Sequence, residues 1–501
     1  MPTFEHSHRS HHHQEDEGTF ESYRRVREAL DLLYSHLKFR HRIDCIHYTS
    51  SYRRILSEDI ISKVNIPKNN ISHMDGFAVK SSDISEASPD KPVILRVISE
   101  HGRTATIMGN RYKDTNKVTT SKKPLNYRFA YPISTGNPLP TGSDTVIPIE
   151  EIGEIITTEK ADLTQADNNN ANNLRQIHNS KHTLLLSGSR TRIRRRRKYL
   201  QNTDRAKLSM ILVYKPFQKG MFVYPKGANI SRGQLVLPKG TRLRAQDIGL
   251  LALLQIFNVS VFAKPKISII PTGSELTDNP AKIKFGKSLN TNSKVIARLI
   301  EEAGAISQDL GVTSDSINAI RYKIVYALKS SDMIITLGGS SVGRKDLVGT
   351  TIESVGKPGV ICHGIRLDRG RVSGLAVIKG KPIVILPGPI HGALSGFIAL
   401  AYPIIGSMTG STKDLFQMSA ILTKDWQARK RFSNFKKILF VNLSEVHTDN
   451  SFHYNAEPLY GESESISILV KAHGYVMVPE DVTFMPEGQY VKVHVMPGLS
   501  F

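Results

Sequence analysis

The chain has 501 residues, enough for three or four domains of about 150 residues each. Its 40% hydrophobic and 22% charged residues, with 36 Gly and 24 Pro, exclude a collagen, a coiled coil and a wholly disordered chain. The formal net charge of +22 favours an anionic partner, which can be a nucleic acid, an acidic membrane or a phosphorylated small molecule. The charge alone does not choose among these three.

Only two cysteines occur, Cys45 and Cys362, and they lie far apart in the sequence. This count excludes a disulfide scaffold and a CxxC zinc or redox site. Residues 1–18 are polar throughout, so no signal peptide is expected. The uncharged stretch from Pro387 to Thr412 is long enough to cross a bilayer, but Pro403 interrupts it and a strand-like run precedes it. A buried helix is the better interpretation, and we expect a soluble cytoplasmic protein without a membrane partner.

The N-terminal part of the chain changes character twice. Residues 1–19 hold a histidine cluster and are predicted to form a disordered tail with at most weak metal affinity. From Tyr23 to Leu37 apolar residues recur at helical spacing, which predicts an amphipathic helix. Residues 52–100 have the pattern of short strands and turns, with a strand over Val93–Ile98. A polar, lysine-rich excursion follows over residues 103–128.

A larger basic insert is predicted over residues 157–219. It combines the asparagine-rich segment Asn168–Asn173 with the arginine-rich run Arg190–Lys198. Segments of this composition are usually exposed and disordered. The run also has the character of an electrostatic contact to a nucleic-acid backbone, although no motif that reads RNA or DNA is visible.

From Lys266 onward the sequence predicts an α/β domain. Apolar runs at Ile267–Ile270, Met333–Leu337 and Ile383–Leu386 each end in a glycine-bearing turn, and a helical pattern follows each turn. Three such units imply a doubly wound parallel sheet with helices on both faces. After about residue 413 apolar and polar residues alternate, as in Ile438–Val441, which predicts a small β-domain.

The predicted fold is therefore multi-domain, α/β plus β, with β-rich accessory domains. A linker subdomain is expected over residues 20–66 and 220–264, and a β-rich subdomain over 67–156. The α/β domain is expected over 265–412 and the C-terminal β-domain over 413–501.

Three turns stand at places where chemistry is expected, because open parallel sheets bind ligands beyond the carboxyl ends of their strands. Gly338–Gly343 offers close backbone approach, two hydroxyls and a following helix, which suits an anion such as phosphate. Taken alone, this loop is equally consistent with a tight turn that binds nothing. The second turn, Thr272–Glu275, suits a helix cap as well as a ligand site, and the third is Pro387–Gly388. Asp75 lies apart from these turns, in a short polar turn that such a residue commonly forms without any catalytic role.

The order and spacing of six motifs resemble the molybdopterin molybdenumtransferases, a family that includes the C-terminal domain of gephyrin. His73-Met-Asp-Gly-Phe-Ala-Val79 is similar to the family's "MDGYAV", and Thr135–Val146 is similar to "TGAPLPEGADAVV". Ser57–Ile60 belongs to the first of these motifs, as the family's "AED" before "MDGYAV". Four further motifs follow in family order, and the resemblance covers about residues 22–150 and 220–500: Gly227–Ile230 with Pro238–Leu243, Ser288–Asn292, Gly338–Gly343 with Asp346, and Leu386–Gly388.

The resemblance implies an elongated, multi-domain homodimer whose α/β domain binds the pterin phosphate. It implies an enzyme that converts adenylated molybdopterin and molybdate, or tungstate, into the metal cofactor and AMP with Mg²⁺ or another divalent cation. On the matching positions it implies catalytic roles for Asp75, Glu275 and Asp346, of which Asp75 and Glu275 also bind the metal. It implies pterin binding by the remaining turn residues: Thr272, Gly273, Ser274, Gly338, Gly339, Ser340, Ser341, Gly343, Pro387 and Gly388.

Several family acids are replaced in this chain. Ala228 and Asn229 stand where the family has acidic residues, and so do Ser274, Asn290 and Arg344. The loss of these acids is expected to weaken cation binding and to make the cleft more positive. Two alternatives to molybdenum insertion therefore stay open: a molybdopterin-binding protein that has lost the transferase step, and a nucleic-acid-binding protein.

Overall fold

A computed structural model of the chain describes residues 23–38, 41–97, 128–157, 183–184, 209–339, 346–411, 416–448 and 451–496. The histidine-rich tail and the arginine-rich run lie outside the described residues, as do Ser340, Ser341 and Gly343. The chain forms two compact units. One unit comprises Met1–Asp59 and Pro238–Phe501, and the other comprises Ile60–Leu237.

The centre of the first unit is a six-stranded sheet. Its first four strands are parallel, and the fifth, β20, is antiparallel to both neighbours. The turn from β20 to β21 explains this departure from a purely parallel sheet. Lys379 and Gly380 both have positive φ, 53° and 72°, as a two-residue hairpin turn requires. The strand order is β17 (Ile306–Asp309), β14 (Lys266–Pro271), β18 (Met333–Leu337), β21 (Lys381–Leu386), β20 (Gly374–Ile378), β19 (Pro358–His363).

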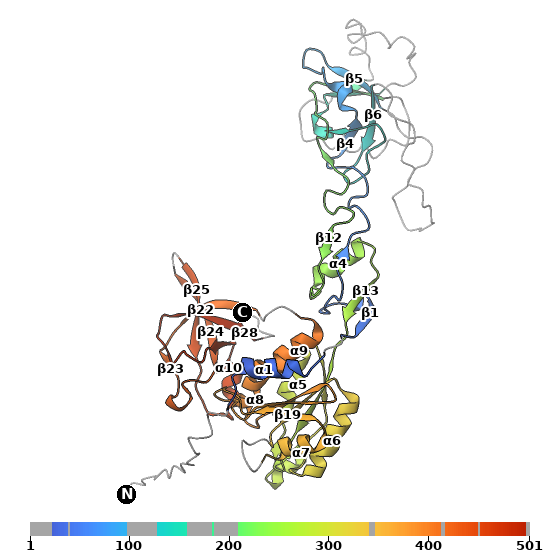
Figure 1. Cartoon of the computed structure of the whole chain (residues 1–501). Helices are drawn as coiled ribbons and strands as arrows, with labels where there is room; N and C mark the ends of the chain where they lie inside the picture. The colour runs from blue at the N-terminus through green and yellow to red at the C-terminus, as the bar shows by residue number, and fades with distance from the viewer. Residues whose placement is uncertain are drawn as a thin grey trace. The chain divides into compact units, whose positions relative to one another are not determined.

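Helices cover both faces of this sheet, as the sequence predicts (Figure 1). The strands β14, β18 and β21 are almost wholly buried, which is why they are continuous apolar runs rather than alternating ones. One face packs against α1 (Val26–Ser35), α5 (Asn292–Glu302) and α8–α9 (Ile390–Gly396 and Tyr402–Thr409, joined by a π-helical turn, Phe397–Ala401). The other face packs against α6 (Ile317–Ser330) and α7 (Leu347–Val355).

The helix Ile390–Thr409 is long and apolar enough to cross a membrane by length and composition. However, 72% of its most apolar stretch is buried inside the protein. Leu394, Phe397 and Leu400 are each at most 2% exposed, and Phe397 and Leu400 pack in the core with the sheet. Its apolar composition is accounted for by this packing.

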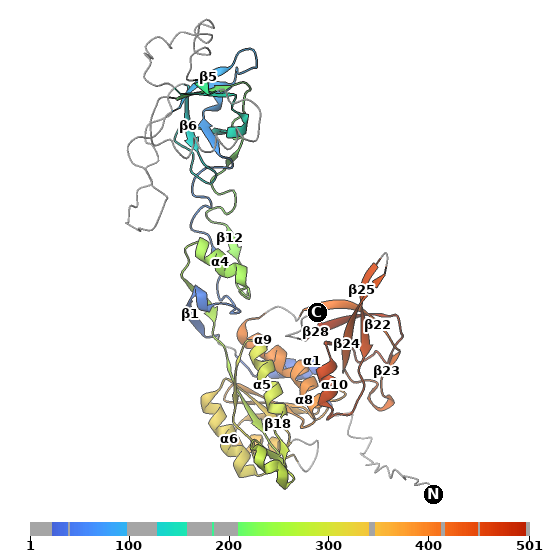
Figure 2. The same cartoon turned by 180° about the vertical axis from the view of Figure 1, so that it is seen from behind.

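The C-terminal part of the first unit is a closed barrel with its own apolar core. Alternation along β24 and β28 places residues such as Leu439, Val441 and Val493 inside. The helix α10 (Ile466–Lys471) contacts β24 (Figure 2). The barrel strands are β22 (Gln417–Leu422), β25 (Ser451–Pro458), β24 (Lys437–Thr448), β26 (Gly474–Val478) and β28 (Tyr490–Val495), and a separate pair joins β23 (Trp426–Gln427) to β27 (Phe484–Met485).

Short elements complete the first unit. Strand β1, before the second unit in the sequence, pairs with β13, which follows it. The helix α4 lies between the second unit and β13 in the sequence. A two-stranded pair, β15 with β16, follows β14 and leads into α5. Their bounds are β1 (Ile43–His47), β13 (Asn258–Phe262), α4 (Ala245–Leu253), β15 (Leu276–Thr277) and β16 (Ser288–Leu289).

The second unit is built on a seven-stranded sheet. Its core contains Phe77, Leu95, Ile147 and Ile211, all fully buried. The strand order is β7 (Thr145–Pro148), β4 (Gly76–Val79), β6 (Phe129–Ile133), β5 (Val93–Val97), β10 (Ser209–Val213), β8 (Glu154–Thr157), β9 (Thr183–Leu184). Two small pairs accompany it: β2 (Ile60–Ile61) with β12 (Leu235–Leu237), and β3 (Ile71–Ser72) with β11 (Val223–Tyr224).

The strand β10 differs from the sequence prediction, which places residues 157–219 in a disordered insert. Residues 209–213 pair with β5 on one side and with β8 on the other. Ile211 and Val213 are fully buried in the core of the unit. The run Met210–Val213 is apolar enough to fill the centre of a sheet, and the charged residues before it obscured this signal.

Candidate functional site at the carboxyl edge of the sheet

Three turns meet where the parallel strands β14, β18 and β21 end. We call this region the carboxyl edge; it comprises Thr272–Glu275, Leu310–Asp315, Gly338–Gly339 and Pro387–Gly388. Gly338 has φ +81°, and a Cβ there would lie 2.5 Å from the backbone oxygen of Thr272. A Cβ on Gly388 would lie 3.8 Å from the Cα of Gly338. The structure therefore brings the three predicted turns into contact through residues without side chains.

Most backbone amides of the turns Thr272–Glu275 and Gly338–Gly339 donate hydrogen bonds within the protein. These amides hold the turns to one another, so they are not available to a ligand. The donors and acceptors are Thr272 N to Leu337 O (2.7 Å), Gly273 N to Thr313 O (3.0 Å), Ser274 N to Asp315 Oδ2 (2.8 Å) and Gly338 N to Leu386 O (3.0 Å).

Four amides at this edge have no acceptor among the described residues, those of Glu275, Ser314, Gly339 and Gly388. Gly388 is exposed, and its carbonyl accepts a hydrogen bond from Asn292 Nδ2 at 2.7 Å. Gly339 has φ +65° and lies against Thr272, because a Cβ there would be 2.9 Å from the Thr272 Cγ2. Pro387 is buried beside them. Of these four amides, the two of glycine carry no side chain that would hinder the approach of an anion.

Two threonine hydroxyls at the edge are buried and have no hydrogen-bond partner in the described part of the chain. They belong to Thr272 and Thr313, which are 2% and 3% exposed. The two residues form a backbone bridge between the end of β14 and the loop after β17. Buried hydroxyls are normally satisfied, and exceptions concentrate at sites where water or a ligand completes them. These hydroxyls therefore mark the same edge as the glycines.

Glu275 follows the first turn and is exposed. Its carboxylate folds back over Gly273, where a Cβ would lie 2.5 Å from Glu275 Oε1. The exposed Lys287 reaches the same turn and donates a hydrogen bond from Nζ to the Ser274 carbonyl. The sequence prediction missed Lys287, although it stands one residue before the Ser288–Asn292 motif. A lysine so placed adds a positive point charge beside the turn, as phosphate binding favours.

Asp346 is the N-cap of α7. Its Oδ1 accepts a hydrogen bond from Gly349 N at 2.9 Å, and its Oδ2 lies 2.7 Å from His363 Nδ1. The other imidazole nitrogen, Nε2, lies 3.0 Å from the Val372 carbonyl. Both partners of the ring are acceptors, so these contacts favour the ring with both nitrogens protonated. Burial opposes the charged ring, but the hydrogen bond and charge of Asp346 outweigh it and raise the pKa of His363. These contacts give Asp346 a structural task, and its catalytic role stays a prediction.

Asp75 lies in the unit Ile60–Leu237, whereas Glu275 and Asp346 lie in the other unit. It is half-buried in the turn before β4, and its Oδ1 accepts hydrogen bonds from Thr135 N at 2.8 Å and Thr135 Oγ1 at 3.0 Å. One oxygen, Oδ2, has no described partner. The three predicted carboxylates therefore occupy three different settings: a turn anchored by threonine, an exposed loop and a helix cap.

A charged network next to the carboxyl edge joins Lys294 to Asp309 and Asp278. Lys294 Nζ lies 2.7 Å from Asp309 Oδ2 and 3.6 Å from Asp278 Oδ1, and the hydrogen bond to Asp309 is the main reason that the pKa of Lys294 is raised. Burial opposes ionisation of Asp278, but hydrogen bonds from the Val312 amide and Asn290, with the charge of Lys294, lower its pKa. Asn290 is 3% exposed and donates from Nδ2 to Asp278 Oδ1 at 2.9 Å. This replaced family acid is therefore buried, so its loss changes the network rather than the open cleft.

The described residues contain no group of three His, Cys, Asp or Glu side chains that would form a metal cage. Mg²⁺ does not require such a cage, because it commonly binds one or two carboxylates together with water and substrate phosphates. The exposed Glu275 beside the glycine turns fits that donor set. The ligands of a Mg²⁺ ion at this edge would be Glu275 and the phosphates of the substrate.

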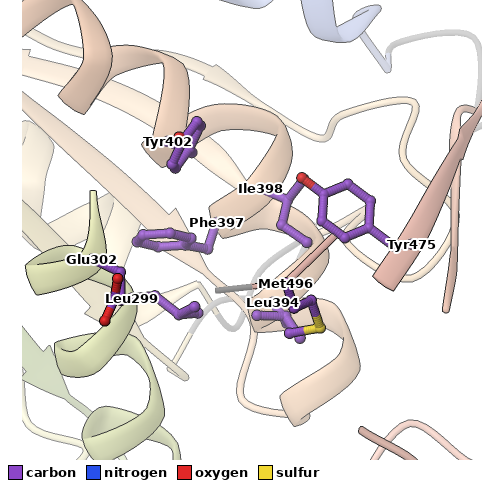
Figure 3. Close-up of a pocket in the computed structure, with 8 residues that line it drawn as sticks. All are labelled: Leu299, Glu302, Leu394, Phe397, Ile398, Tyr402, Tyr475 and Met496. Carbon is purple, nitrogen blue, oxygen red and sulfur yellow. The ribbon is translucent and has the colours of Figure 1, made fainter. Parts of the chain in front are cut away.

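A separate apolar cavity lies between α5, the α8–α9 helix and the barrel (Figure 3). None of the carboxyl-edge residues lines it, and Glu302 is the only charged side chain among the residues that do. This composition offers no group for phosphate chemistry. The lining residues are Leu299, Glu302, Leu394, Phe397, Ile398, Tyr402, Tyr475 and Met496.

Three family models match the chain in order. They are the MoeA N-terminal region (domain I and II) over residues 24–254, the probable molybdopterin binding domain over 268–407, and the MoeA C-terminal region (domain IV) over 434–496. The carboxyl edge falls within the second of these regions, and Asp75 falls within the first.

Relatives and solved structures agree with these matches. The molybdopterin molybdenumtransferase of Bacillus subtilis (strain 168) is 27% identical over 459 residues, which cover 91% of each chain. That of Staphylococcus epidermidis is 24% identical over 457 residues, 91% of this chain and 92% of its own. The crystal structure of the molybdopterin biosynthesis MoeA protein from Pyrococcus horikosii covers 95% of this chain and 100% of its own, with a TM-score of 0.70 at 26% identity.

Proposed function

We propose that this chain, which belongs to the molybdopterin molybdenumtransferase family and acts in molybdenum cofactor biosynthesis, inserts molybdenum from molybdate into adenylated molybdopterin and releases AMP. Tungstate is the alternative oxyanion. The observation that carries the proposal is the meeting of three glycine turns at the carboxyl edge. There the N–H groups of Gly339 and Gly388 have no acceptor among the described residues and are the donors that we propose for a phosphate.

The residues of the edge divide the work of binding. The N–H groups of Gly339 and Gly388 donate to phosphate oxygens, and glycine at these positions lets the anion approach the backbone. Ser274 Oγ accepts from Asp315 N at 3.1 Å, which leaves its proton for a ligand oxygen. Lys287 supplies a positive charge beside the same turn. These groups fix the pterin phosphate but do not by themselves cleave a phosphoanhydride.

Carboxylates provide the second requirement, which is the handling of a cation and a proton. We propose Mg²⁺ as the cation, held by Glu275 and the substrate phosphates. When bound, it neutralises phosphate charge and polarises the anhydride. Asp75 Oδ2 has no partner among the described residues while Thr135 holds Oδ1, so the carboxylate is oriented and able to accept a proton or contact a cation. The exposed Ala228 and Asn229, which replace family acids, supply no charge to this task.

The finer predictions remain proposals of their own. We propose a cytoplasmic homodimer without a membrane partner, on the strength of the family. Contact of the arginine-rich run Arg190–Lys198 with nucleic acid would be an accessory property. The molar mass in light scattering tests the first, since a monomer of 55.8 kDa would contradict it. Salt-dependent binding to unrelated oligonucleotides tests the second.

The deciding experiment is a single turnover assay with the purified full chain. Adenylated molybdopterin and Mg²⁺ are supplied with molybdate, with tungstate or with neither, and AMP is measured. We expect AMP release that depends on the oxyanion. Tight binding of adenylated molybdopterin without AMP release would instead select a binding protein that has lost the transferase step. Absence of binding would overturn both.

A further inference from the structure

We propose that Lys323 is a positioning residue whose ammonium group holds the loop Leu310–Asp315 in the shape that the pterin-phosphate turn Thr272–Ser274 requires. The inference rests on the proposed function for its ligand. It concerns a residue that lies on the outer helix α6, away from the glycine turns, and that no motif in the sequence singles out.

The ammonium group of Lys323 is surrounded by backbone carbonyls. Its Nζ lies 2.5 Å from Leu310 O, 2.8 Å from Gly311 O and 3.3 Å from Val312 O. Three successive carbonyls that converge on one point repel one another unless a cation or donor lies between them. The side chain is half-buried, and burial lowers the pKa of Lys323 while Asp309 and Asp278 partly offset that effect. A lysine thus acts here as a built-in cation for three carbonyls.

The amides of the same loop face the opposite charge. Gly311 N donates to Asp309 Oδ1 at 2.8 Å, and Val312 N donates to Asp278 Oδ2 at 2.9 Å. The loop is thus held between carboxylates on its amide side and Lys323 on its carbonyl side. Gly311, with φ +76°, allows the bend that separates the two sides. Loss of the ammonium group would leave the carbonyl side without its partner and release the loop.

The loop transmits its position directly to the phosphate turn. Thr313 N donates to Pro271 O at 2.8 Å, and Gly273 N donates to Thr313 O at 3.0 Å. Asp315 and Ser274 bond reciprocally, at 2.8 Å from Ser274 N to Asp315 Oδ2 and at 3.1 Å from Asp315 N to Ser274 Oγ. Every amide from Gly273 to Ser274 is therefore fixed by this loop. A shift of the loop would displace Ser274 and the adjacent Glu275.

Lys381 provides a matched control, because it does similar chemistry at the other end of the sheet. Its Nζ donates to Leu328 O at 2.7 Å and to Ser331 O at 2.6 Å, between the end of α6 and the start of β18. Removal of either ammonium group leaves carbonyls without a donor and costs stability. Only the loss of Lys323 is expected to reach the phosphate turn.

The test compares Lys323→Met with Lys381→Met in the full chain, by thermal unfolding, by molybdopterin binding and by amide hydrogen exchange. Both variants are expected to lower the Tm. Lys323→Met is expected to weaken molybdopterin binding at least about tenfold and to speed exchange at Gly273 and Ser274, whereas Lys381→Met changes neither. Lys323→Gln keeps an uncharged donor and is expected to fall between the wild type and Lys323→Met, so the series still decides if Lys323→Met does not fold.

The outcomes separate the two proposals. Wild-type affinity and wild-type exchange at Gly273 and Ser274 in Lys323→Met would overturn the positioning role, and so would equal losses in Lys381→Met. A wild-type chain that binds no molybdopterin would overturn the proposed function. In that case the exchange rates at Gly273 and Ser274 still support or overturn the positioning role, because they are measured without ligand.

Discussion

The two ends of the central sheet are built differently. At the amino ends of the strands, the hydroxyls of Ser268 and Ser331 bond to each other. Asp332 accepts from Lys266 N at 2.8 Å and from Arg42 at 2.8 Å. At the carboxyl ends, by contrast, buried hydroxyls have no described partner and two glycines with positive φ lie against Thr272. They are Thr272 and Thr313, and Gly338 and Gly339.

Binding energy for a ligand is available where polar groups of the protein have no partner. Groups that are satisfied within the protein stabilise the fold and offer a ligand nothing. Groups that are buried or preorganised but unsatisfied gain their partner only when a ligand arrives. On the proposed function, the amino ends of the strands form a structural end of the sheet and the carboxyl ends form its binding end, and we expect substitutions at the two ends to affect different measurements.

The largest effect is expected from an added methyl group at the binding end. In Gly338→Ala the new Cβ would lie 2.5 Å from the Thr272 carbonyl oxygen, at a φ of +81°. The strain of about 1–2 kcal/mol adds to this clash, so the turn must move. We expect molybdopterin affinity to fall at least about 100-fold in isothermal titration calorimetry.

Gly380→Ala is the control for that substitution at the structural end. Gly380 has φ +72°, and nothing lies within 4 Å of its added Cβ. We expect a loss of about 1 kcal/mol in the free energy of unfolding with unchanged affinity. Equal losses of affinity in the two variants would show that the glycine turns have no special part in binding.

Asp75 lies outside the central sheet. We therefore expect its substitution to affect turnover rather than the binding proposed at the carboxyl edge. In Asp75→Asn the remaining carbonyl oxygen still accepts from Thr135 N and Oγ1, and only the charge is lost. We expect AMP release to fall about 100-fold with nearly unchanged affinity for adenylated molybdopterin. Asp83→Asn, a buried carboxylate of the same unit that accepts from Arg128 N at 2.9 Å, is the control. Turnover that survives in Asp75→Asn would make this residue structural.

Asn290→Asp tests whether a replaced family acid affects the cation site or only the buried network around Asp278. Asn290→Asp would put a second carboxylate against Asp278, 2.9 Å from its Oδ1, in place of a donor. We expect the free energy of unfolding to fall by about 1–3 kcal/mol in urea titrations. The Mg²⁺ concentration needed for AMP release should stay unchanged. A lower Mg²⁺ requirement would place residue 290 in the cation site and contradict the buried role.

The smallest effect is a pH dependence at the cap of α7. The pKa of His363 is raised above the ordinary 6.5 in the folded chain. The His363–Asp346 pair therefore stabilises the fold fully below about pH 6.5, and this contribution is lost as pH rises through the higher folded pKa. In the wild type, the free energy of unfolding should therefore fall as pH rises from about 6.5 through the folded pKa of His363. In His363→Gln this part of the pH dependence should be absent. The control is His447→Gln, which removes an exposed histidine whose Nε2 lies 3.5 Å from Glu445 Oε2. This variant should keep the pH dependence of the wild type.

The sequence predicted the frame of the binding end well, because the signals there are local. Apolar runs at Ile267–Ile270, Met333–Leu337 and Ile383–Leu386 lie within buried parallel strands, and the family assignment is confirmed by three matching models. The helical pattern expected after the turn Gly338–Gly343 is confirmed by α7, which begins directly after its N-cap Asp346.

Contacts between distant segments could not be predicted in this way. The amides of Gly273 and Ser274 have partners 40 and 41 residues away, at Thr313 and Asp315, so the sequence did not reveal that they are already used. Lys323 lies within an ordinary helical pattern, and only the path of the loop after β17 gives it three carbonyl partners. For the same reason Asn290 was expected to affect the open cleft, whereas it is buried.

The most direct test of phosphate binding by the glycine turns is a crystal structure of the full chain with adenylated molybdopterin. We expect the terminal pterin phosphate within hydrogen-bond distance of Gly339 N and Gly388 N, with Ser274 Oγ as a further donor. A phosphate bound at the amino ends of the strands or in the cavity lined by Phe397 and Tyr475, with the glycine turns empty, would contradict it.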